Sequence, residues 1–268
     1  MLSGGLRTKN ITKQPQENNP LITVVTVVRN GEKTIEQTIL SIINQTYHNI
    51  EYIIVDGAST DGTLGIIKRY EDRVDYWISE PDKGIYDAMN KGIDLAKGDY
   101  IALLNSDDWY EQDTCEIIAN KINEVKADVY YGIVRVIDKN NIFIYVTAYY
   151  IYNINHYMIP HQTCFISKEI YTKFRYDINY KLASDYDFII RIYKFDASFC
   201  FIEKIMTNCK TGGMSSSMTC SIEKLEIKRK YKFMPLHKYY IKIILVVINH
   251  IYIKLGLTMK KLGIDGTF

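Results

Sequence analysis

Runs of β-branched and aromatic residues alternate with helical patterns through the first 108 residues, and this alternation limits the fold more than any other feature. The first run, residues 21–28, is continuously β-branched, as expected of a strand covered on both faces in a parallel sheet. Buried strands are also predicted at residues 50–55 and 100–104, and a short strand at 74–78. Apolar residues recur at helical spacing between them, in residues 32–45, up to about residue 70, and in 84–96. This order predicts right-handed βαβ units in an α/β fold.

Polar residues follow each of these strands. Arg29, Asp56, residues 80–83 and residues 105–108 stand directly after the four apolar runs. Ligands of open parallel sheets bind outside the carboxyl ends of the strands. The sequence therefore predicts that these four polar clusters meet at one rim and form a binding site.

Two adjacent carboxylates, Asp107 and Asp108, end the last of these strands. Like charges at a strand end are costly unless a positive group lies there, and a divalent cation that carries a phosphate would remove that cost. The alternative is a polar loop that caps the following helix, with Glu111 and Gln112 in its first turn. Both interpretations fit these residues alone.

The second half of the chain is less regular. A helix is predicted from beyond Glu111 to about Val125, and another helix begins at residues 182–188 and continues to Ile192. The remaining predictions are a strand pair at 128–137 and 141–146, an irregular loop at 149–157, strands at 161–166 and 198–202, and a flexible turn at 211–217.

Composition excludes several classes of protein. Lys+Arg 33 against Asp+Glu 31 gives a formal net charge of +2, too balanced for a general nucleic-acid binder. The five cysteines are scattered and show no C-x-x-C spacing, so neither a zinc site nor a disulfide framework is indicated and a cytoplasmic location fits. Residues 1–19 are polar, lack the apolar core of a signal peptide, and are predicted to be a disordered lead-in.

Residues 218–268 differ from the rest and are predicted to form a basic, amphipathic helical extension. Lysines and arginines run into an apolar stretch at residues 243–248, which Asn249 and His250 interrupt before it reaches the roughly 20 residues that span a bilayer. A helix lying on an anionic membrane surface fits this pattern. A helix that closes the domain core, or a dimer contact, fits it equally well.

Five motifs in order resemble the family 2 glycosyltransferases of the GT-A fold. The resemblance covers roughly residues 21–217, and the motifs lie at residues 26–32, 56–63, 84–92, 105–108 and 184–187. It implies a Rossmann-like catalytic domain at residues 20–217, with a nucleotide-binding half at about 20–110 and an acceptor half at about 111–217. It also implies inverting transfer of a sugar from a nucleotide-sugar donor, usually a UDP-sugar, with Mn²⁺ or Mg²⁺ as cofactor.

The resemblance also assigns roles on the nucleotide side. Val27, Arg29 and Glu32 would border the base and ribose, and Asp56 would accept a hydrogen bond from the uracil ring. Asn105 would approach the ribose, and Asp107 would bind the metal as the second acid of the family's Asp-x-Asp motif, whose first acid is replaced here by Asn105. Further candidates are Ser106 for the nucleotide, Lys83 for the uracil or diphosphate, and Asp108 as a second metal ligand. A solvated turn lysine is the alternative for Lys83.

On the acceptor side, Asp185 matches the position of the family's catalytic base. A carboxylate opposite the leaving group can take the proton of the attacking hydroxyl during a single displacement with inversion. The alternative is that Asp185 caps a helix. His161 is a candidate acceptor contact or metal ligand, with a buried strand histidine as the alternative.

Two other functions remain open at this point. A nucleotidyltransferase of related topology also uses carboxylates and a dication, but residues 29–32 do not form the glycine-rich phosphate loop expected of it. A nucleotide-sugar-binding module without catalysis is the second alternative. The resemblance suggests a glycan or lipid-linked acceptor in surface polysaccharide or O-antigen biosynthesis, at the cytoplasmic face of the inner membrane.

Overall fold

The computed structural model describes residues 1–138, 140, 142–211 and 217–254. Within them, ten strands form one sheet in the order β1-β4-β3-β2-β5-β9-β7-β10-β6, and β8 pairs with β7 off this path. The strands are β1 (Leu2–Gly4), β2 (Ile22–Val28), β3 (Ile50–Asp56), β4 (Tyr76–Ser79), β5 (Tyr100–Asn105), β6 (Trp109–Tyr110), β7 (Val129–Ile137), β8 (Phe143–Thr147), β9 (Phe165–Ser167) and β10 (Phe199–Lys210).

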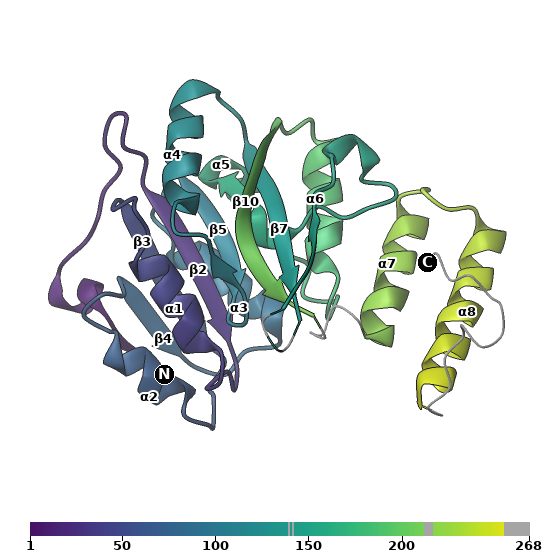
Figure 1. The fold of residues 1–268 in the computed structure, drawn as a ribbon, viewed down its shortest axis with the longest axis horizontal. Helices are drawn as coiled ribbons and strands as arrows, with labels where there is room; N and C mark the ends of the chain where they lie inside the picture. The colour runs from purple at the N-terminus through teal and green to yellow at the C-terminus, as the bar shows by residue number, and fades with distance from the viewer. Residues whose placement is uncertain (139, 141, 212–216, 255–268) are drawn as a thin grey trace.

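Helices flank this sheet (Figure 1). They are α1 (Ile35–Ile43), α2 (Thr63–Arg69), α3 (Ile85–Leu95), α4 (Thr114–Glu124), α5 (Lys168–Lys173), α6 (Ser184–Lys194), α7 (Met218–Lys230) and α8 (Leu236–Lys254). Three short 3₁₀ helices complete the described elements: η1 (Leu6–Lys9), η2 (Ile151–Asn153) and η3 (His161–Thr163). Strands β4, β3, β2 and β5 are parallel to one another, so the predicted α/β fold with a parallel centre is confirmed.

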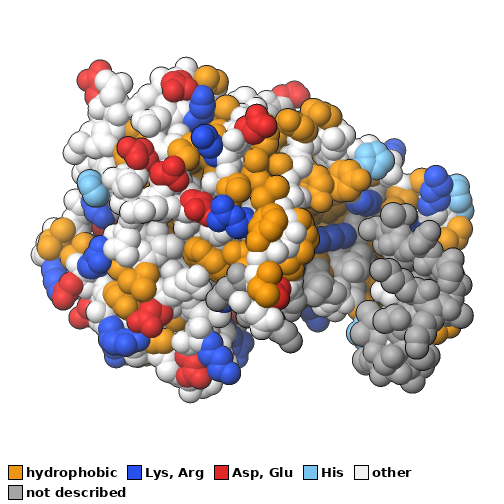
Figure 2. Space-filling view, viewed as in Figure 1, with side chains coloured by type: hydrophobic (Ala, Val, Ile, Leu, Met, Phe, Trp, Pro, Cys, Tyr) orange, Lys and Arg blue, Asp and Glu red, His pale blue; other side chains and the backbone are white. Residues whose placement is uncertain are grey.

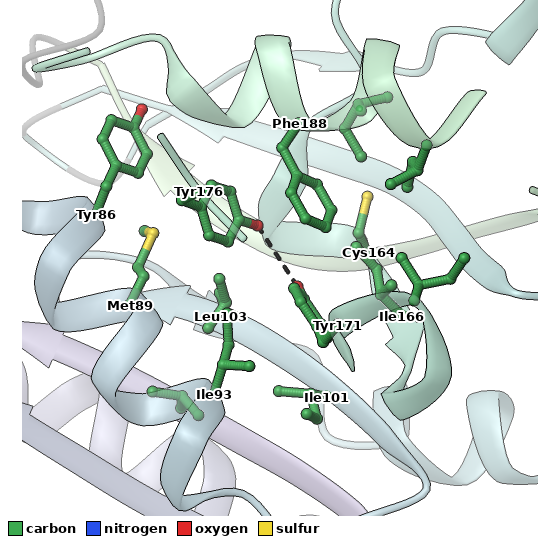
Figure 3. Packing of buried hydrophobic residues seen from close by; sticks show 14 of the residues in the cluster. Tyr86, Met89, Ile93, Ile101, Leu103, Cys164, Ile166, Tyr171, Tyr176 and Phe188 are labelled. Atoms are coloured by element: carbon green, nitrogen blue, oxygen red, sulfur yellow. Dashed lines mark hydrogen bonds between the residues drawn. The ribbon is translucent and has the colours of Figure 1, made fainter. Parts of the chain in front are cut away.

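The central strands are buried on both faces, as their continuous apolar sequence predicts. Along β2, Val25 and Val27 belong to one hydrophobic cluster, whereas Val24 and Val28 belong to the other. Successive side chains of a strand point to opposite faces, so one β-branched run supplies both cores. Figure 3 shows the first cluster, in which residues of β5 and α3 pack against aromatic side chains that include Tyr171, Tyr176 and Phe188.

The prediction that residues 1–19 are a disordered lead-in is wrong for the first ten residues. Strand β1 pairs antiparallel with β4 at the end of the sheet, with Gly4 beside Trp77. A Cβ at Gly4 would lie 2.6 Å from the Trp77 ring, and Gly5 has a φ of 98°, so both positions favour glycine. Arg7 then forms an ion pair with the buried Glu51. Long-range pairing, rather than local apolar content, orders this segment.

The region around the predicted strand at 161–166 also differs. Residues His161–Thr163 form the 3₁₀ helix η3, and only Phe165–Ser167 form a strand, β9. Strand β9 pairs with β5 and with the first part of β7, whereas β8 pairs with the last part of β7. In the chain, η3 therefore lies between β8 and β9, which pair with opposite ends of β7. The predicted strand at 198–202 is longer than expected, because β10 pairs with β7 from Phe199 to Lys210.

Two helices follow the sheet domain at its C-terminal end. Helices α7 and α8 pack on each other, and α7 lies between α6 and α8, beyond the last strands of the sheet (Figure 1). Most of the turn predicted at 211–217 and the chain beyond residue 254 lie outside the described residues.

Candidate active site

The carboxyl ends of the central strands lie at one rim. Val28 of β2 is the register partner of Asp56 in β3, and Val27 is the partner of Asn105 in β5. Ser79, at the end of β4, is also a register partner of Asp56. The prediction that the polar clusters after these strands converge is therefore confirmed for β2, β3, β4 and β5.

Two loops at this rim are joined by hydrogen bonds. The side-chain oxygen of Asn30 accepts from the backbone N–H of Thr60 at 2.8 Å, and the backbone N–H of Asn30 donates to Ser59 Oγ at 2.7 Å. Glu32, predicted to border the nucleotide, accepts from the backbone N–H of Gly62 at 2.8 Å. The loop after β2 thus fixes the loop after β3.

Asp56, the predicted uracil partner, is fully buried at the floor of these loops. Its carboxylate accepts hydrogen bonds from the Ser59 hydroxyl and from Ser79 Oγ, the latter at 2.6 Å. A Cβ at the neighbouring Gly57 would lie 2.1 Å from Asp82 Oδ2 and 3.5 Å from the Cβ of Arg29. Gly57 therefore lets three rim segments meet.

The remaining nucleotide-side candidates surround this floor. Val27 is buried, whereas Arg29 and Lys83 are exposed. Ser106 lies next to the first loop, since a Cβ at Gly31 would be 3.3 Å from its hydroxyl oxygen. The structure therefore places these candidates along the rim, with long basic side chains on its solvent side.

The two adjacent carboxylates after β5 have different surroundings. Asp107 is exposed, whereas Asp108 is 4% exposed and accepts from Asn105 Nδ2 at 3.4 Å. Burial, with the charge of Asp107, raises the pKa of Asp108 to about 7. Neither residue caps the next helix, because α4 begins only at Thr114.

The structure does not gather the predicted metal ligands into one group. Among the described residues, no three His, Cys, Asp or Glu side chains are arranged to hold a metal ion. Asp108 is turned into the protein, and the ring nitrogens of His161 already face Asp185 and Asn105. Two groups remain able to bind a metal ion, the carboxylate of Asp107 and the side-chain oxygen of Asn105. The Asn105 oxygen is buried and has no hydrogen-bond partner in the described part of the chain.

A chain of polar contacts links this rim to α6. Asn105 Nδ2 lies 3.4 Å from His161 Nε2, and His161 Nδ1 lies 2.9 Å from Asp185 Oδ2. Asp185, in the first turn of α6, is 6% exposed. The helix-cap alternative for Asp185 does not apply, because the residue before α6, Ala183, is the N-cap and α6 has no side-chain cap.

Asp185 and His161 stabilise each other's charged form. Burial would raise the pKa of Asp185, but the hydrogen bond and charge of His161 and the charge of Lys224 hold this pKa below its usual range. Burial would lower the pKa of His161, but the hydrogen bond and charge of Asp185 and the charge of Asp108 raise it. Asp185 therefore stays ionised near neutral pH.

Tyr86 is a site residue that the sequence did not reveal. Its hydroxyl donates to Asp185 Oδ1 at 3.1 Å, and the backbone N–H of Tyr186 donates to the same oxygen at 2.9 Å. In Figure 3 the Tyr86 ring lies at the edge of the core cluster, with its hydroxyl pointing away from Tyr176. A tyrosine on the apolar face of a predicted helix is indistinguishable from a core residue by spacing alone.

Helix α7 holds the segment that precedes Asp185. The carboxylate of Glu223 accepts hydrogen bonds from the backbone N–H groups of Lys181, Leu182 and Ala183 at 2.7, 2.8 and 2.9 Å. Ala183 is the N-cap of α6, and Lys181 and Leu182 directly precede it, so Glu223 satisfies the backbone donors of the segment that enters the helix. Glu223 therefore acts as a cap supplied from another helix.

The second contact between α6 and α7 is a buried ionic cluster. Asp187 is 1% exposed and accepts from Arg191 Nε at 2.7 Å, from Lys230 Nζ at 2.8 Å and from the Tyr231 hydroxyl at 2.9 Å. Burial would raise the pKa of Asp187, but these hydrogen bonds lower it. Asp187 thus joins the two helices.

Solved structures of similar fold are glycosyltransferases. TarS 1-349 from S. aureus in complex with UDP superimposes with a TM-score of 0.63 at 20% sequence identity, covering 77% of this chain and 64% of that chain. The mannosyltransferase PcManGT from Pyrobaculum calidifontis, in complex with GDP-Man and Mn²⁺, gives a TM-score of 0.59 at 16% identity, covering 91% and 75%. The fold is therefore that of the GT-A glycosyltransferases, as the resemblance implied.

Relatives in sequence agree with this class. A PGL/p-HBAD biosynthesis glycosyltransferase of Mycobacterium bovis is 32% identical over 184 residues, which are 65% of this chain and 70% of the relative. The glycosyltransferase GlyA of Streptococcus pneumoniae is 38% identical over 113 residues, which are 41% of this chain and only 16% of GlyA. The chain thus matches only a small part of GlyA.

The fold and the relatives together define a sugar-transferring enzyme. Residues 23–199 match the family described as Glycosyl transferase family 2. The chain belongs to this family, and the predictions of a family 2 glycosyltransferase and of a transferase enzyme are confirmed.

Proposed function

We propose that this glycosyltransferase moves a sugar from a UDP-sugar to a hydroxyl of a glycan or lipid-linked acceptor, with inversion, in surface polysaccharide biosynthesis. The observation that carries this proposal is the link from the nucleotide rim to α6, in which Asn105, His161 and Asp185 follow one another in contact. These contacts connect the proposed donor site at the ends of the strands to the buried carboxylate of Asp185. TarS, which shares the fold, has been solved with UDP and with UDP-GlcNAc.

On the donor side, the fixed loops after β2 and β3 form the nucleotide subsite of this proposal. Asp56 is held by two serine hydroxyls, so its carboxylate is oriented before a base arrives. Val27, Arg29 and Glu32 border the base and ribose. The exposed Lys83 extends from the same rim and can reach the uracil or the diphosphate.

A divalent cation, Mn²⁺ or Mg²⁺, belongs to this proposal as cofactor. Asp107 and the unpartnered oxygen of Asn105 would hold it, and a hard cation accepts such oxygens together with those of a diphosphate. When bound, the cation stabilises the negative charge that develops on the leaving nucleoside diphosphate. Asp108 and His161 take other roles, because each is engaged inside the protein.

On the acceptor side, Asp185 acts as the catalytic base. Its carboxylate is ionised near neutral pH, and Tyr86 and His161 fix both of its oxygens, which leaves a lone pair on Oδ2 for the acceptor proton. A positioned base removes that proton as the hydroxyl attacks the anomeric carbon from the side opposite the diphosphate. His161 positions the base and balances its charge.

The experiment that tests this function is donor hydrolysis. A panel of nucleotide sugars is incubated with the protein, with Mn²⁺ and with chelator, and release of nucleoside diphosphate is measured. Turnover of a UDP-sugar in the presence of Mn²⁺ is the expected result. UDP binding without release of UDP from any donor, when acceptor extracts are also supplied, would instead identify a binding module.

We also propose that the protein acts at the cytoplasmic face of the inner membrane, in peripheral contact through its C-terminal helices. Within the described residues, no helix is both long and apolar enough to cross a bilayer. Helix α8 exposes Leu236, Tyr240, Ile241, Ile244, Val247 and Ile248, which recur at helical spacing on one side. An apolar face flanked by lysines fits an anionic bilayer surface.

A further inference from the structure

Three lysines of the two C-terminal helices have no ion-pair partner within the described residues. Lys224 and Lys228 are one helical turn apart on α7, and Lys242 lies on α8, which packs against α7. All three are half-buried, and none of them forms an ion pair within the described residues. We call these three residues the lysine cluster.

The surroundings of the cluster explain why its charges stay unpaired. The carboxylate of the neighbouring Glu223 accepts hydrogen bonds from three backbone N–H groups and forms no ion pair with these lysines. Glu226 lies two residues from Lys224 and from Lys228, so it faces another side of the helix. The other basic residues of this part of α7 are engaged elsewhere, because Lys230 pairs with Asp187 and Arg229 lies over the Tyr239 ring.

Lys224 and Lys228 share one side of α7, and α8, which carries Lys242, packs on α7, so these positive charges lie near one another. Burial, together with the charges of Lys242 and Lys224, lowers the pKa of Lys228. The side chain of Lys228 is held in place by donation from Nζ to the backbone oxygen of His156 at 2.9 Å. Neighbouring like charges are unfavourable unless an anion compensates them, so this arrangement points to an anionic ligand.

Helix α7, which carries two of these lysines, also adjoins the segment that leads to Asp185. Helix α7 contacts the segment before α6 through Glu223 and through Cys220, whose thiol lies 3.5 Å from the backbone oxygen of Leu182. The positive charge of Lys224 also helps to lower the pKa of Asp185. Figure 2 shows lysine and arginine side chains where the body of the molecule meets the C-terminal helices.

We propose that Lys224, Lys228 and Lys242 bind a phosphate or diphosphate ester carried by the acceptor. Such a group needs two or more positive charges that converge on its oxygens, and lysine ammonium groups supply them as point charges. Helix α7, which carries Lys224 and Lys228, packs on α6, which carries Asp185, whereas Asn105 at the end of β5 lies on the other side of His161. Donor and acceptor phosphates would thus be held apart, with the acceptor hydroxyl near the base. This proposal rests on the proposed function.

Binding of inorganic pyrophosphate tests the cluster directly. Calorimetric titration is carried out with the full chain at saturating UDP, so that the donor site is filled. We expect pyrophosphate to bind, and Lys224→Ala and the double variant Lys224→Ala/Lys228→Ala to weaken binding about tenfold or more. Lys126→Ala, a change at an exposed lysine after α4, should leave the affinity unaltered.

Two further measurements separate the outcomes. UDP binding by each variant reports an intact fold, and Lys224→Arg should retain pyrophosphate binding because it keeps the charge. A soluble short-chain prenyl diphosphate should bind like pyrophosphate. Equal pyrophosphate affinity in wild type and the folded double variant would overturn the proposal, as would lysine-dependent binding to phosphatidylglycerol vesicles with no binding of either soluble diphosphate.

The two proposals fail in different ways. Absence of turnover with every donor, together with lysine-dependent pyrophosphate binding, would contradict the transferase function alone. Turnover of a donor with lysine-independent pyrophosphate binding would contradict the acceptor-phosphate site alone.

Discussion

Asp185 is the residue on which the proposed chemistry depends most. Asp185→Asn keeps the shape and the contact with Tyr86 but removes the charge that accepts a proton. We expect UDP binding within a factor of about two of wild type and transfer reduced about 10²-fold or more, which is the usual contribution of a positioned base. Titration with UDP measures the binding, and product formation measures the transfer.

Asp113→Asn is the matched control, because Asp113 is exposed and lies before α4, away from α6. It should transfer as wild type does. Normal transfer by Asp185→Asn would remove Asp185 from the role of base and would direct attention to His161.

Asp107→Ala addresses the cofactor. Asp107 is the exposed carboxylate of the rim, so its loss should abolish the gain in UDP affinity that Mn²⁺ confers while leaving UDP binding in chelator unchanged. Titrations of UDP with and without Mn²⁺ measure this difference. If Mn²⁺ still strengthens UDP binding in this variant, the cation is held by other residues.

Among the elements, α7 has a structural role in the site through Glu223. Glu223→Ala leaves three N–H groups before α6 without an acceptor, and only the N–H of Ala183 is fully buried, so the free energy of unfolding should fall by about 1–3 kcal/mol. Because α6 carries Asp185, kcat should fall more than the UDP affinity. Urea denaturation and transfer kinetics measure the two effects.

Glu226→Ala provides the comparison within the same helix, since Glu226 is exposed one turn from the contact. It should change stability by less than about 0.5 kcal/mol. Equal stability of the two variants would show that the Glu223 cap contributes little.

Helix α8 is the element that tests membrane contact. Ile241→Glu/Ile244→Glu places two negative charges on the exposed apolar face and leaves α7 and its cap intact. Co-sedimentation with vesicles that contain phosphatidylglycerol should fall at least tenfold, because burial of the apolar face and attraction to anionic lipid are both lost. Unchanged sedimentation would favour a dimer contact, which size-exclusion chromatography would then detect.

The elements that were predicted correctly are those whose signal is local. Strand β2 and its neighbours are continuous β-branched runs, and the ends of parallel strands meet at one rim by topology alone. Strand β1 and the cap from Glu223 were not predicted, because both depend on partners distant in sequence. The contact between His161 and Asp185 was missed for the same reason, although both residues were selected as candidates.

At the scale of the whole molecule, buried titrating groups set how stability depends on pH. The pKa of Asp108 is raised to about 7, so the folded state binds a proton between pH 4 and 7 that the unfolded state releases. The raised pKa of His161 acts in the same direction above about pH 6.5. Both contributions weaken the folded state as pH rises.

Stability should therefore fall between pH 5 and pH 8, by roughly 3 kcal/mol from Asp108 alone. Asp185 acts oppositely, since its lowered pKa favours the fold above about pH 4 and this contribution is lost at lower pH. Chemical denaturation at several pH values measures the curve. Asp108→Asn should flatten it and be more stable than wild type at pH 8, and an unchanged slope would contradict the assignment.

The strand at Leu2–Gly4 has a practical consequence for the sheet as a whole. It covers the outer edge of β4, whose backbone donors and acceptors would otherwise face solvent. Trimming the first ten residues to simplify expression would open that edge to pairing with another chain, and preparations made in this way should self-associate. An N-terminal purification tag is better attached through a spacer, so that this strand can still pair with β4.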